Sequence, residues 1–248
     1  MSMKFRINNK TYRLRPWVQV VLTILCVLTL FFCLKPFLSN KENDNPNSNK
    51  PYSSIVIDAG HGGADVGAIA LSDNQVYERD LALEYAKEIG KQIEAINPNF
   101  KVYYTRTGNE IPWVEDDSSQ FELDDLNGRT KFANDIRPDF FISIHFNSNG
   151  DTSVHGYTGF IKSDDTVMQE VFASIEKNLS ENNWSQSLDI HTNEEYSLQL
   201  VDFIKGHTML YEVGFLSNEE ELKKLQDPDN RVMIAKAIAK AYCDQVEK

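Results

Sequence analysis

Two histidines and two glutamates in this chain have the residue types and positions needed for a catalytic metal site. His61 and His145 each come near the end of an apolar run that predicts a buried strand, and Glu212 does the same in a third run. Glu78 opens a stretch of helix formers, so its carboxylate lies at a helix start. Two imidazoles and one carboxylate can hold zinc with a position left open for water, and a second carboxylate can act as a base.

The apolar runs are the predicted strands that must bring these side chains together. They cover residues 55–57, 138–147 and 208–214. If the strands are parallel neighbours, their carboxyl ends meet at one edge of the sheet, where open α/β sheets place their ligands. The glycines around His61 let the backbone turn sharply and approach a bound group. The residues alone leave open which glutamate binds the metal and which acts as the base.

Each of these residues also has a simpler interpretation. His145 fits a hydrogen-bonded core histidine, and Glu78 fits an ordinary carboxylate at a helix N-terminus, favoured by the helix dipole. Glu212 is harder to explain in this way, because an ionised carboxylate in an apolar strand is costly unless it is paired or metal-bound. The other histidines, which fit surface or turn positions, are His155, His191 and His207.

Strands and helices alternate after residue 54, which predicts an α/β fold with a mainly parallel sheet and helices on both faces. Further strands are predicted at Lys101–Thr105, Gly156–Lys162 and Tyr196–Phe203. Helices are predicted at Glu78–Ala95, Arg129–Asn134, Thr166–Asn178 and Asp229–Val246. Pro228, just ahead of the last helix, suits a helix start.

The segment Glu115–Asp125 carries six acidic residues. We interpret it as a solvated loop that leads into a helix. A calcium site is the alternative, but the segment lacks the internal glycine and the terminal glutamate of an EF-hand.

Charge is unevenly distributed along the 248 residues, whose net charge is −12. The first 16 residues contain five basic side chains and no acidic one, which leaves 20 basic and 37 acidic residues and a net charge of −17 for the remainder. Neutralising phosphates requires Lys and Arg, so we expect no nucleic-acid partner.

An apolar segment near the N-terminus predicts a membrane anchor. Residues 17–34 contain no charge and are flanked by Arg15 and Lys35, which is just long enough to span a bilayer. We predict a cytoplasmic basic tail at 1–16 and a transmembrane signal-anchor at 17–37, with the rest of the chain outside the cell membrane. A cleaved signal peptide is the alternative, but bulky residues occupy the place where cleavage needs small ones.

The polar, Asn-rich segment 38–53 is a predicted disordered linker, followed by a catalytic domain at 54–248 on the cell-wall side. Cys243 is the only cysteine of that domain, so an intramolecular disulfide is excluded there. The domain must therefore be stable through its core alone.

Several motifs in sequence order carry a family resemblance. They are DAGHGGADVGA, ERDLALEYA, YYTR, RTKFAN, ISIHFNS and YEVGFLSNEEE. The chain resembles the zinc-dependent N-acetylmuramoyl-L-alanine amidases, which hydrolyse bacterial cell walls, over residues 55–242. The resemblance implies a three-layer α/β sandwich around a twisted, mostly parallel sheet.

The resemblance also implies a division of roles among the four residues. It implies one Zn²⁺ bound by His61, Glu78 and His145, with Glu212 as the catalytic carboxylate. The implied substrate is peptidoglycan, cut at the amide between the lactyl group of N-acetylmuramic acid and the L-alanine of the stem peptide. We expect the protein to be a monomer. Ala59 departs from the proline that is common in the family, but no proposed ligand is changed.

Four further residues are candidates for supporting roles. Asp58, Ser143 and Asn147 flank the histidines and are candidates for hydrogen bonds that fix the imidazole tautomers. Arg129 is a candidate for binding a carboxylate of the stem peptide. Two rival functions remain: a zinc peptidase of related fold, which would cut within the stem peptide, and a non-catalytic wall-binding protein, which would not need Glu212.

Overall fold

The computed structural model describes residues 4–7, 10–13, 54–70, 75–115 and 117–247. The predicted anchor and linker lie outside these ranges. Within the described residues, no helix combines the length and the apolar character that a bilayer span requires. In the predicted N-terminal tail, strands β1 (Lys4–Ile7) and β2 (Lys10–Arg13) pair antiparallel, with Lys4 opposite Arg13.

The second unit of the chain, residues 51–248, is built around a six-stranded sheet. The strand order is β6-β3-β7-β10-β8-β9, and every neighbouring pair is parallel except β8 and β10. The prediction of a mainly parallel sheet is confirmed. The strands are β3 (Ser54–Ala59), β6 (Lys101–Tyr104), β7 (Phe140–Asn147), β8 (Tyr157–Ile161), β9 (Ser187–Thr192) and β10 (His207–Phe215).

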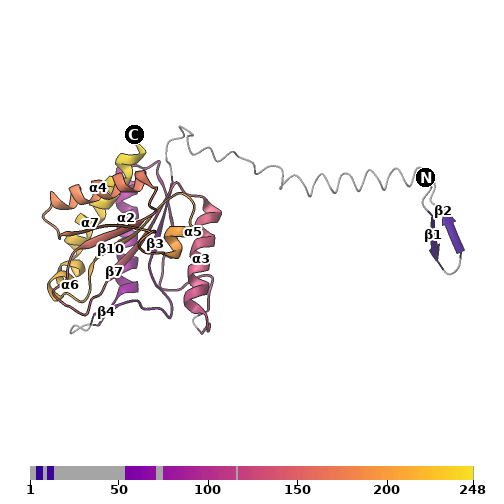
Figure 1. The fold of residues 1–248 in the computed structure, drawn as a ribbon, viewed down its shortest axis with the longest axis horizontal. Coiled ribbons are helices and arrows are strands. Elements are labelled where there is room, and N and C mark those ends of the chain that lie inside the picture. The colour runs from indigo at the N-terminus through magenta and orange to yellow at the C-terminus, as the bar shows by residue number, and fades with distance from the viewer. Residues whose placement is uncertain (1–3, 8–9, 14–53, 71–74, 116, 248) are drawn as a thin grey trace. The chain divides into compact units, whose positions relative to one another are not determined.

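Helices cover both faces of this sheet, as predicted. Alternate residues of β3 separate two apolar clusters: Ile55 and Ile57 pack with α2, α4, α6 and α7, whereas Val56 packs with α3 and α5. Figure 1 shows α2, α4 and α7 on one side of the strands and α3 and α5 on the other. The helices are α2 (Glu78–Ile96), α3 (Phe121–Ile136), α4 (Thr166–Ser180), α5 (Gln199–Phe203), α6 (Glu219–Gln226) and α7 (Pro228–Val246).

Helix α2 is fixed by a buried ridge that runs along its length. Leu81, Tyr85, Ile89 and Ile93 are spaced by four residues and are at most 5% exposed, so they form one apolar stripe against the core. Burying each such aliphatic side chain stabilises the fold by about 1.5–3 kcal/mol. This packing sets the position of the helix start, where Glu78 lies.

One predicted strand is wrong. In the stretch Tyr196–Phe203, residues 199–203 form the short helix α5. Leu200 and Ile204 are buried at a helical spacing against the β3–β7 part of the sheet, and this packing outweighs the strand-like alternation of the sequence.

Several short or polar elements were not predicted. The edge strand β9 is half-exposed and carries polar residues, so it lacks a clear two-residue period. A two-stranded ribbon, β4 (Ile69–Ala70) and β5 (Val76–Tyr77), precedes α2, and the polar helix α6 follows β10.

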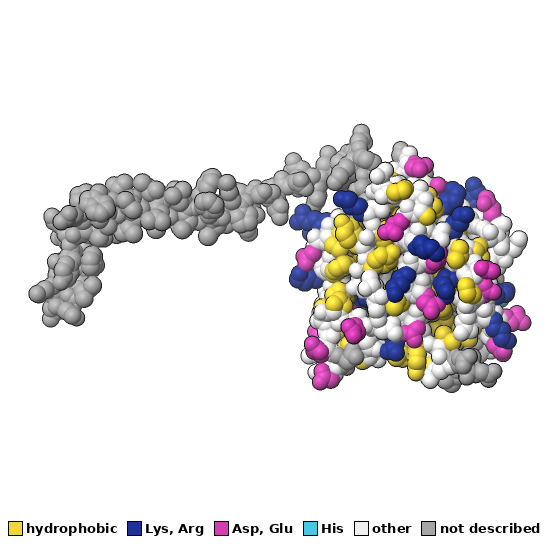
Figure 2. Space-filling model, turned by 180° about the vertical axis from the view of Figure 1, so that it is seen from behind, with side chains coloured by type: hydrophobic (Ala, Val, Ile, Leu, Met, Phe, Trp, Pro, Cys, Tyr) yellow, Lys and Arg dark blue, Asp and Glu magenta, His cyan; other side chains and the backbone are white. Residues whose placement is uncertain are grey.

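The acidic segment does lead into a helix, because α3 begins at Phe121, with Glu122 and Asp124 in its first turn. Trp113 Nε1 donates to Asp125 Oδ1 at 2.9 Å, which fixes the preceding loop against this helix. On the face shown in Figure 2, acidic and basic side chains are interspersed with apolar ones.

Candidate metal centre

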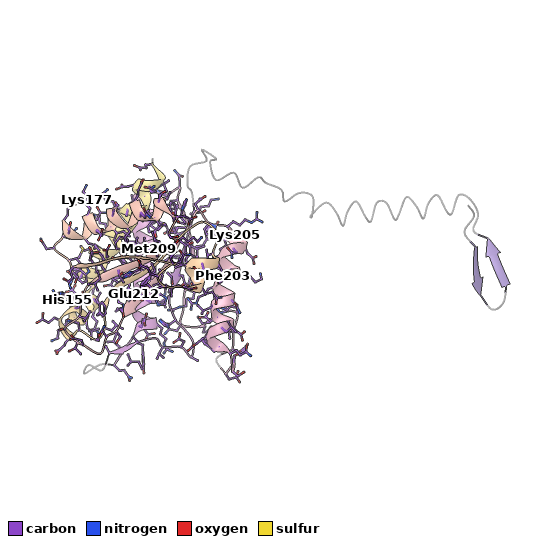
Figure 3. The ribbon with its side chains drawn as sticks, viewed as in Figure 1. His155, Lys177, Phe203, Lys205, Met209 and Glu212 are labelled. Atoms are coloured by element: carbon purple, nitrogen blue, oxygen red, sulfur yellow. The ribbon has the colours of Figure 1, made fainter. Side chains whose placement is uncertain are left out.

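The three central strands bring the predicted residues to one sheet edge. β3, β7 and β10 are adjacent and parallel, so their carboxyl ends lie side by side. Glu212 on β10 lies directly opposite His145 on β7. Figure 3 labels Glu212 and Met209 on β10; Met209 belongs to the core cluster of α2 and α7, and the alternation of side chains places Glu212 on the opposite face.

His61 and His145 converge on one carboxylate oxygen. His61 Nε2 and His145 Nδ1 each lie 3.0 Å from Glu78 Oε1. The two ring centroids are 4.8 Å apart, with an angle of 76° between the ring planes. One candidate ligand atom from each of the three residues lies within 4.8 Å of the other two, so a single small cation between them would contact all three.

The carboxylate of Glu78 is held by the backbone as well as by the rings. Its Oε2 accepts from the Ala68 N–H at 2.8 Å, and its Oε1 accepts from the Phe146 N–H at 3.0 Å. Burial by itself raises the pKa of Glu78, but the hydrogen bonds and charges of His145 and His61 outweigh it and hold that pKa well below its usual range. Glu78 is therefore an ionised group with a fixed orientation.

His61 has a partner that the sequence analysis missed. Its Nδ1 lies 2.6 Å from Asp65 Oδ2, and the other oxygen of Asp65 accepts from the Gly67 N–H at 3.0 Å. Burial by itself lowers the pKa of His61, but the hydrogen bonds and charges of Asp65 and Glu78 outweigh burial and raise this pKa to about 10. The sequence feature that could have indicated this pair is a carboxylate four residues after a histidine in a glycine-rich turn.

Two glycines leave room for the candidate ligands. A Cβ on Gly60 would lie 2.3 Å from Cε1 of His145, and one on Gly67 would lie 2.6 Å from Oε2 of Glu78. Gly67 also has a φ of +65°, which side chains rarely adopt. Both positions require glycine because the backbone passes so close to the functional groups.

Glu212 is the unpaired member of the site. Its Oε2 is buried and has no hydrogen-bond partner among the described residues. Burial raises the pKa of Glu212 to about 7, with the negative charge of Glu78 adding to the shift and the nearby histidines opposing it. A buried carboxyl group that titrates near neutral pH beside two imidazoles is a typical feature of a catalytic site.

Comparison with known proteins agrees with this geometry. Residues 55–244 match the family described as N-acetylmuramoyl-L-alanine amidase (Amidase_3). The chain belongs to this amidase family. The predicted family resemblance and enzyme class are thereby confirmed.

Individual relatives resemble this amidase over most of its length. The germination-specific N-acetylmuramoyl-L-alanine amidase of Bacillus subtilis is 28% identical over 231 residues, covering 90% of this chain and 92% of the relative. The probable cell wall amidase LytH of Staphylococcus epidermidis is 26% identical over 79% of this chain, which spans 58% of that relative.

Solved structures share the fold of this amidase. The CwlD amidase of Clostridioides difficile, solved in complex with the GerS lipoprotein, has a TM-score of 0.69 and 25% identity over 79% of this chain and 98% of its own. The catalytic domain of the CwlV amidase from Bacillus (Paenibacillus) polymyxa var. colistinus has a TM-score of 0.66 and 25% identity, with the same coverage.

Three of the remaining candidate residues of this amidase, Asp58, Ser143 and Arg129, lie in a buried network beside the histidines, whereas Asn147 is half-buried and lies outside it. Asp58 accepts hydrogen bonds from Thr105 Oγ1, Ser143 Oγ and Arg129 Nη1, so its bonds go to a guanidinium and two hydroxyls and not to an imidazole. Asn147 accepts from the Ser148 N–H at 2.8 Å, in the turn after β7.

Arg129 lies inside the amidase, with only 2% of its surface exposed. Its Nε donates to Asp125 at 3.0 Å, its Nη1 to Asp58 and to the Ala59 carbonyl, and its Nη2 to the His61 carbonyl. A carboxylate of the stem peptide would have to displace one of these internal partners before it could bind.

A pocket of about 310 Å³ opens beside the two histidines. Leu126 and Leu200 supply apolar walls, and Glu122 adds an exposed carboxylate. The pocket lies between the carboxyl edge of the sheet and the helices α3 and α5, and both candidate histidine ligands line it.

The donor set of this amidase fits zinc. Two imidazole nitrogens and one carboxylate oxygen are the ligands of many catalytic zinc sites, which keep a fourth position open. Zinc bonds of about 2.1 Å in a tetrahedron place ligand atoms roughly 3.4 Å apart; the two nitrogens lie 3.0 Å from Glu78 Oε1. The unpartnered oxygen of Glu212 adds a further reason to expect a cation nearby.

Proposed function

We propose that this amidase is a zinc-dependent peptidoglycan hydrolase that cuts the amide between N-acetylmuramic acid and L-alanine. The observation that carries the proposal is the convergence of His61 and His145 on one oxygen of Glu78. Glu212 lies unpaired on the strand next to His145, where a catalytic base is needed. Family membership supplies the reaction class.

In this proposal His61, Glu78 and His145 hold the metal. When bound, zinc lowers the pKa of a water molecule toward about 7 and polarises the amide carbonyl. The hydrogen bond that Asp65 accepts from His61 Nδ1 fixes the ring of His61 with Nε2 toward Glu78, and the backbone N–H groups of Ala68 and Phe146 fix Glu78. The chain thus supplies a rigid set of donors.

Glu212 moves the proton. It takes one proton from the attacking water, whose oxygen bonds to the lactyl carbonyl carbon. As the C–N bond breaks, Glu212 returns that proton to the nitrogen of L-alanine. Burial raises the pKa of Glu212 in the metal-free protein to about 7, and a base whose pKa is close to the working pH can accept and release a proton readily.

Mass spectrometry of digested peptidoglycan tests this function. We expect the purified protein to release intact stem peptides that begin with L-alanine, leaving glycan strands with free lactyl carboxylates. A chelator should stop the release and added zinc should restore it. Fragments cut within the stem peptide would instead indicate a peptidase, and release that resists a chelator would contradict the metal dependence.

We also propose that residues 17–37 anchor the protein in the cell membrane, with the catalytic domain on the wall side. The support is the uncharged apolar segment between Arg15 and Lys35. The anchor would raise the local concentration of the enzyme at the wall. Deleting residues 1–50 should then lower activity on whole walls more than on soluble wall fragments, and equal losses on both would contradict this role.

A further inference from the structure

Three consecutive carbonyls at the His61 turn accept hydrogen bonds from two arginines. Arg106 donates from Nε to the Ala59 carbonyl at 2.9 Å and from Nη2 to the Gly60 carbonyl at 2.8 Å. Arg129 donates from Nη1 to the same Ala59 carbonyl at 2.7 Å and from Nη2 to the His61 carbonyl at 2.6 Å. The two guanidinium groups therefore enclose the backbone that carries His61.

Arg106 is buried and directed at backbone oxygens. It is 4% exposed, and it also donates to the carbonyls of Gly108 and Arg79 at 2.9 and 2.7 Å. Within the described ranges, no carboxylate lies within ion-pair distance of it. Burial and the charge of Arg129 lower the pKa of Arg106 to about 10, although the charges of nearby carboxylates oppose this shift. Four backbone carbonyls therefore satisfy this guanidinium.

Arg129 reaches the same backbone from a different element, α3, and is held by two carboxylates. Asp58 and Asp125 both pair with its guanidinium. Asp58 is itself fixed by the hydroxyls of Thr105 and Ser143. The two carboxylates therefore hold the planar guanidinium of Arg129 in the orientation in which it donates to the turn.

The backbone at this turn needs such support. His61 has a φ of 59°, in the left-handed region that disfavours residues with a side chain by roughly 1–2 kcal/mol. Gly62 and Gly63 follow with φ values of 134° and 54°. β3 ends at Ala59, so the carbonyls of Gly60 and His61 lie beyond the strand and need other donors.

We propose that Arg106 and Arg129 are positioning residues of the hydrolase, which clamp residues 59–61 so that the His61 ring meets Glu78 and His145. The inference rests on the proposed zinc-dependent function. Both arginines act through the turn, because their guanidinium groups donate to its carbonyls. Loss of either clamp should let the His61 ring leave the position in which its Nε2 binds zinc.

Lysine variants test the clamp. Arg106→Lys and Arg129→Lys keep the charge but replace a fork that bonds two carbonyls with a single ammonium. We expect each folded variant to bind zinc about 10–100-fold more weakly in competition with a chromophoric chelator. The visible absorption of the Co²⁺-loaded variants should also change in position or intensity. Arg231→Met is the control, because Arg231 of α7 pairs with the exposed Glu84, outside the ligand set and the His61 turn, and should leave both measurements unchanged.

Circular dichroism separates this role from simple stabilisation. A purely structural arginine lowers the melting temperature but leaves the zinc affinity of the folded protein unchanged, and that result would overturn the clamp. If Arg129→Lys does not fold, the zinc affinity of Arg106→Lys is measured alone. Replacing Arg106 leaves no buried carboxylate unpaired, so we expect this variant to fold. Wild-type protein that takes up no zinc would overturn the proposed function and the clamp with it, whereas equal zinc affinities in wild type and variants would overturn only the clamp.

Discussion

Glu78 and Glu212 are two carboxylates of one site, and their surroundings differ in almost every respect. Glu78 faces two imidazoles and two backbone N–H groups, and its pKa lies well below the usual range. Glu212 has a buried oxygen without a partner among the described residues, and its pKa is raised to about 7. The comparison teaches that the environment, and not the residue type, suits one carboxylate to bind metal and the other to transfer protons.

The difference arises from the elements that carry the two residues. Glu78 opens α2 and can extend between the strand ends, where N–H groups and histidine rings are available. Glu212 lies within β10, whose backbone groups pair with β7 and β8, so its side chain meets few donors. Replacing each glutamate by the neutral glutamine should therefore have a different consequence at each of the two positions.

The largest expected effect is the loss of turnover when the base is neutralised. Glu212→Gln removes the proton acceptor and keeps the shape, so kcat should fall by about 10²–10⁴-fold. Zinc content, measured by atomic absorption, should stay at the wild-type level. Glu219→Gln, which changes an exposed glutamate, is the control. Loss of zinc together with activity would show that Glu212 is a ligand, and would contradict the division of roles between Glu78 and Glu212.

Glu78→Gln should act on the metal first. The amide keeps the size of the side chain but removes the negative charge that faces two imidazoles, so we expect zinc affinity to fall by at least roughly 100-fold. Isothermal titration of the metal-free protein measures this. Activity should partly return at high zinc concentration, whereas an inactive variant with unchanged zinc affinity would contradict the role of Glu78 as a ligand.

Asp65→Asn should have a smaller effect, because Asp65 acts through His61. The substitution weakens the hydrogen bond to Nδ1, and loss of such a partner lowers metal affinity by about 10–100-fold. Asp80→Asn is a matched control, since Asp80 lies nearby on α2 and hydrogen-bonds to Asn109 outside the ligand set. Equal zinc affinity in the two variants would show that the orientation of His61 does not depend on Asp65.

The smallest expected effect concerns how the stability of the metal-free protein depends on pH. The pKa of Glu212 is about 7 in the folded protein and 4.5 in the unfolded chain. Between these two pH values the folded form therefore holds a proton that the unfolded form has released. Stability therefore falls as the pH rises from 4.5 to 7, and the penalty is complete above 7.

Glu212→Gln cannot ionise and escapes this penalty. Its stability relative to wild type should be greater at pH 8 than at pH 6 by roughly 1–2 kcal/mol, measured by urea unfolding in the presence of a chelator. Taking the difference between the two pH values removes the fixed cost of the amide. The same relative stability at both pH values would show that Glu212 titrates like an exposed carboxyl group.

The sequence predicted the elements whose apolar pattern is long or strongly periodic. The strands that carry His145 and Glu212 and the helix that begins at Glu78 were predicted close to their observed bounds. The error at Tyr196–Phe203 occurred in a short segment, where burial against α3 and the sheet favoured a helix over the local alternation. Short segments contain too few residues for a period to be distinguished.

The candidate site divides in the same way. His61, Glu78 and His145 could be identified because each stands at the boundary of a regular element. Asp65 and Arg106 were missed because their roles depend on the path of irregular backbone, through a turn at His61 and a loop after β6. Arg129 was identified, but its position on α3 gave no sign that its guanidinium is buried against carbonyls.

The order of motifs along the chain thus determined the family and the candidate metal ligands, because residue chemistry and element periodicity are properties of the sequence itself. The tertiary structure decided how those residues are held. Only the folded chain brings Asp65 to His61, two arginines to three carbonyls, and one oxygen of Glu212 to a buried place where the described residues offer it no donor. These are contacts between side chains and backbone whose direction is set by the turn geometry and the packing of the sheet, which no local pattern encodes.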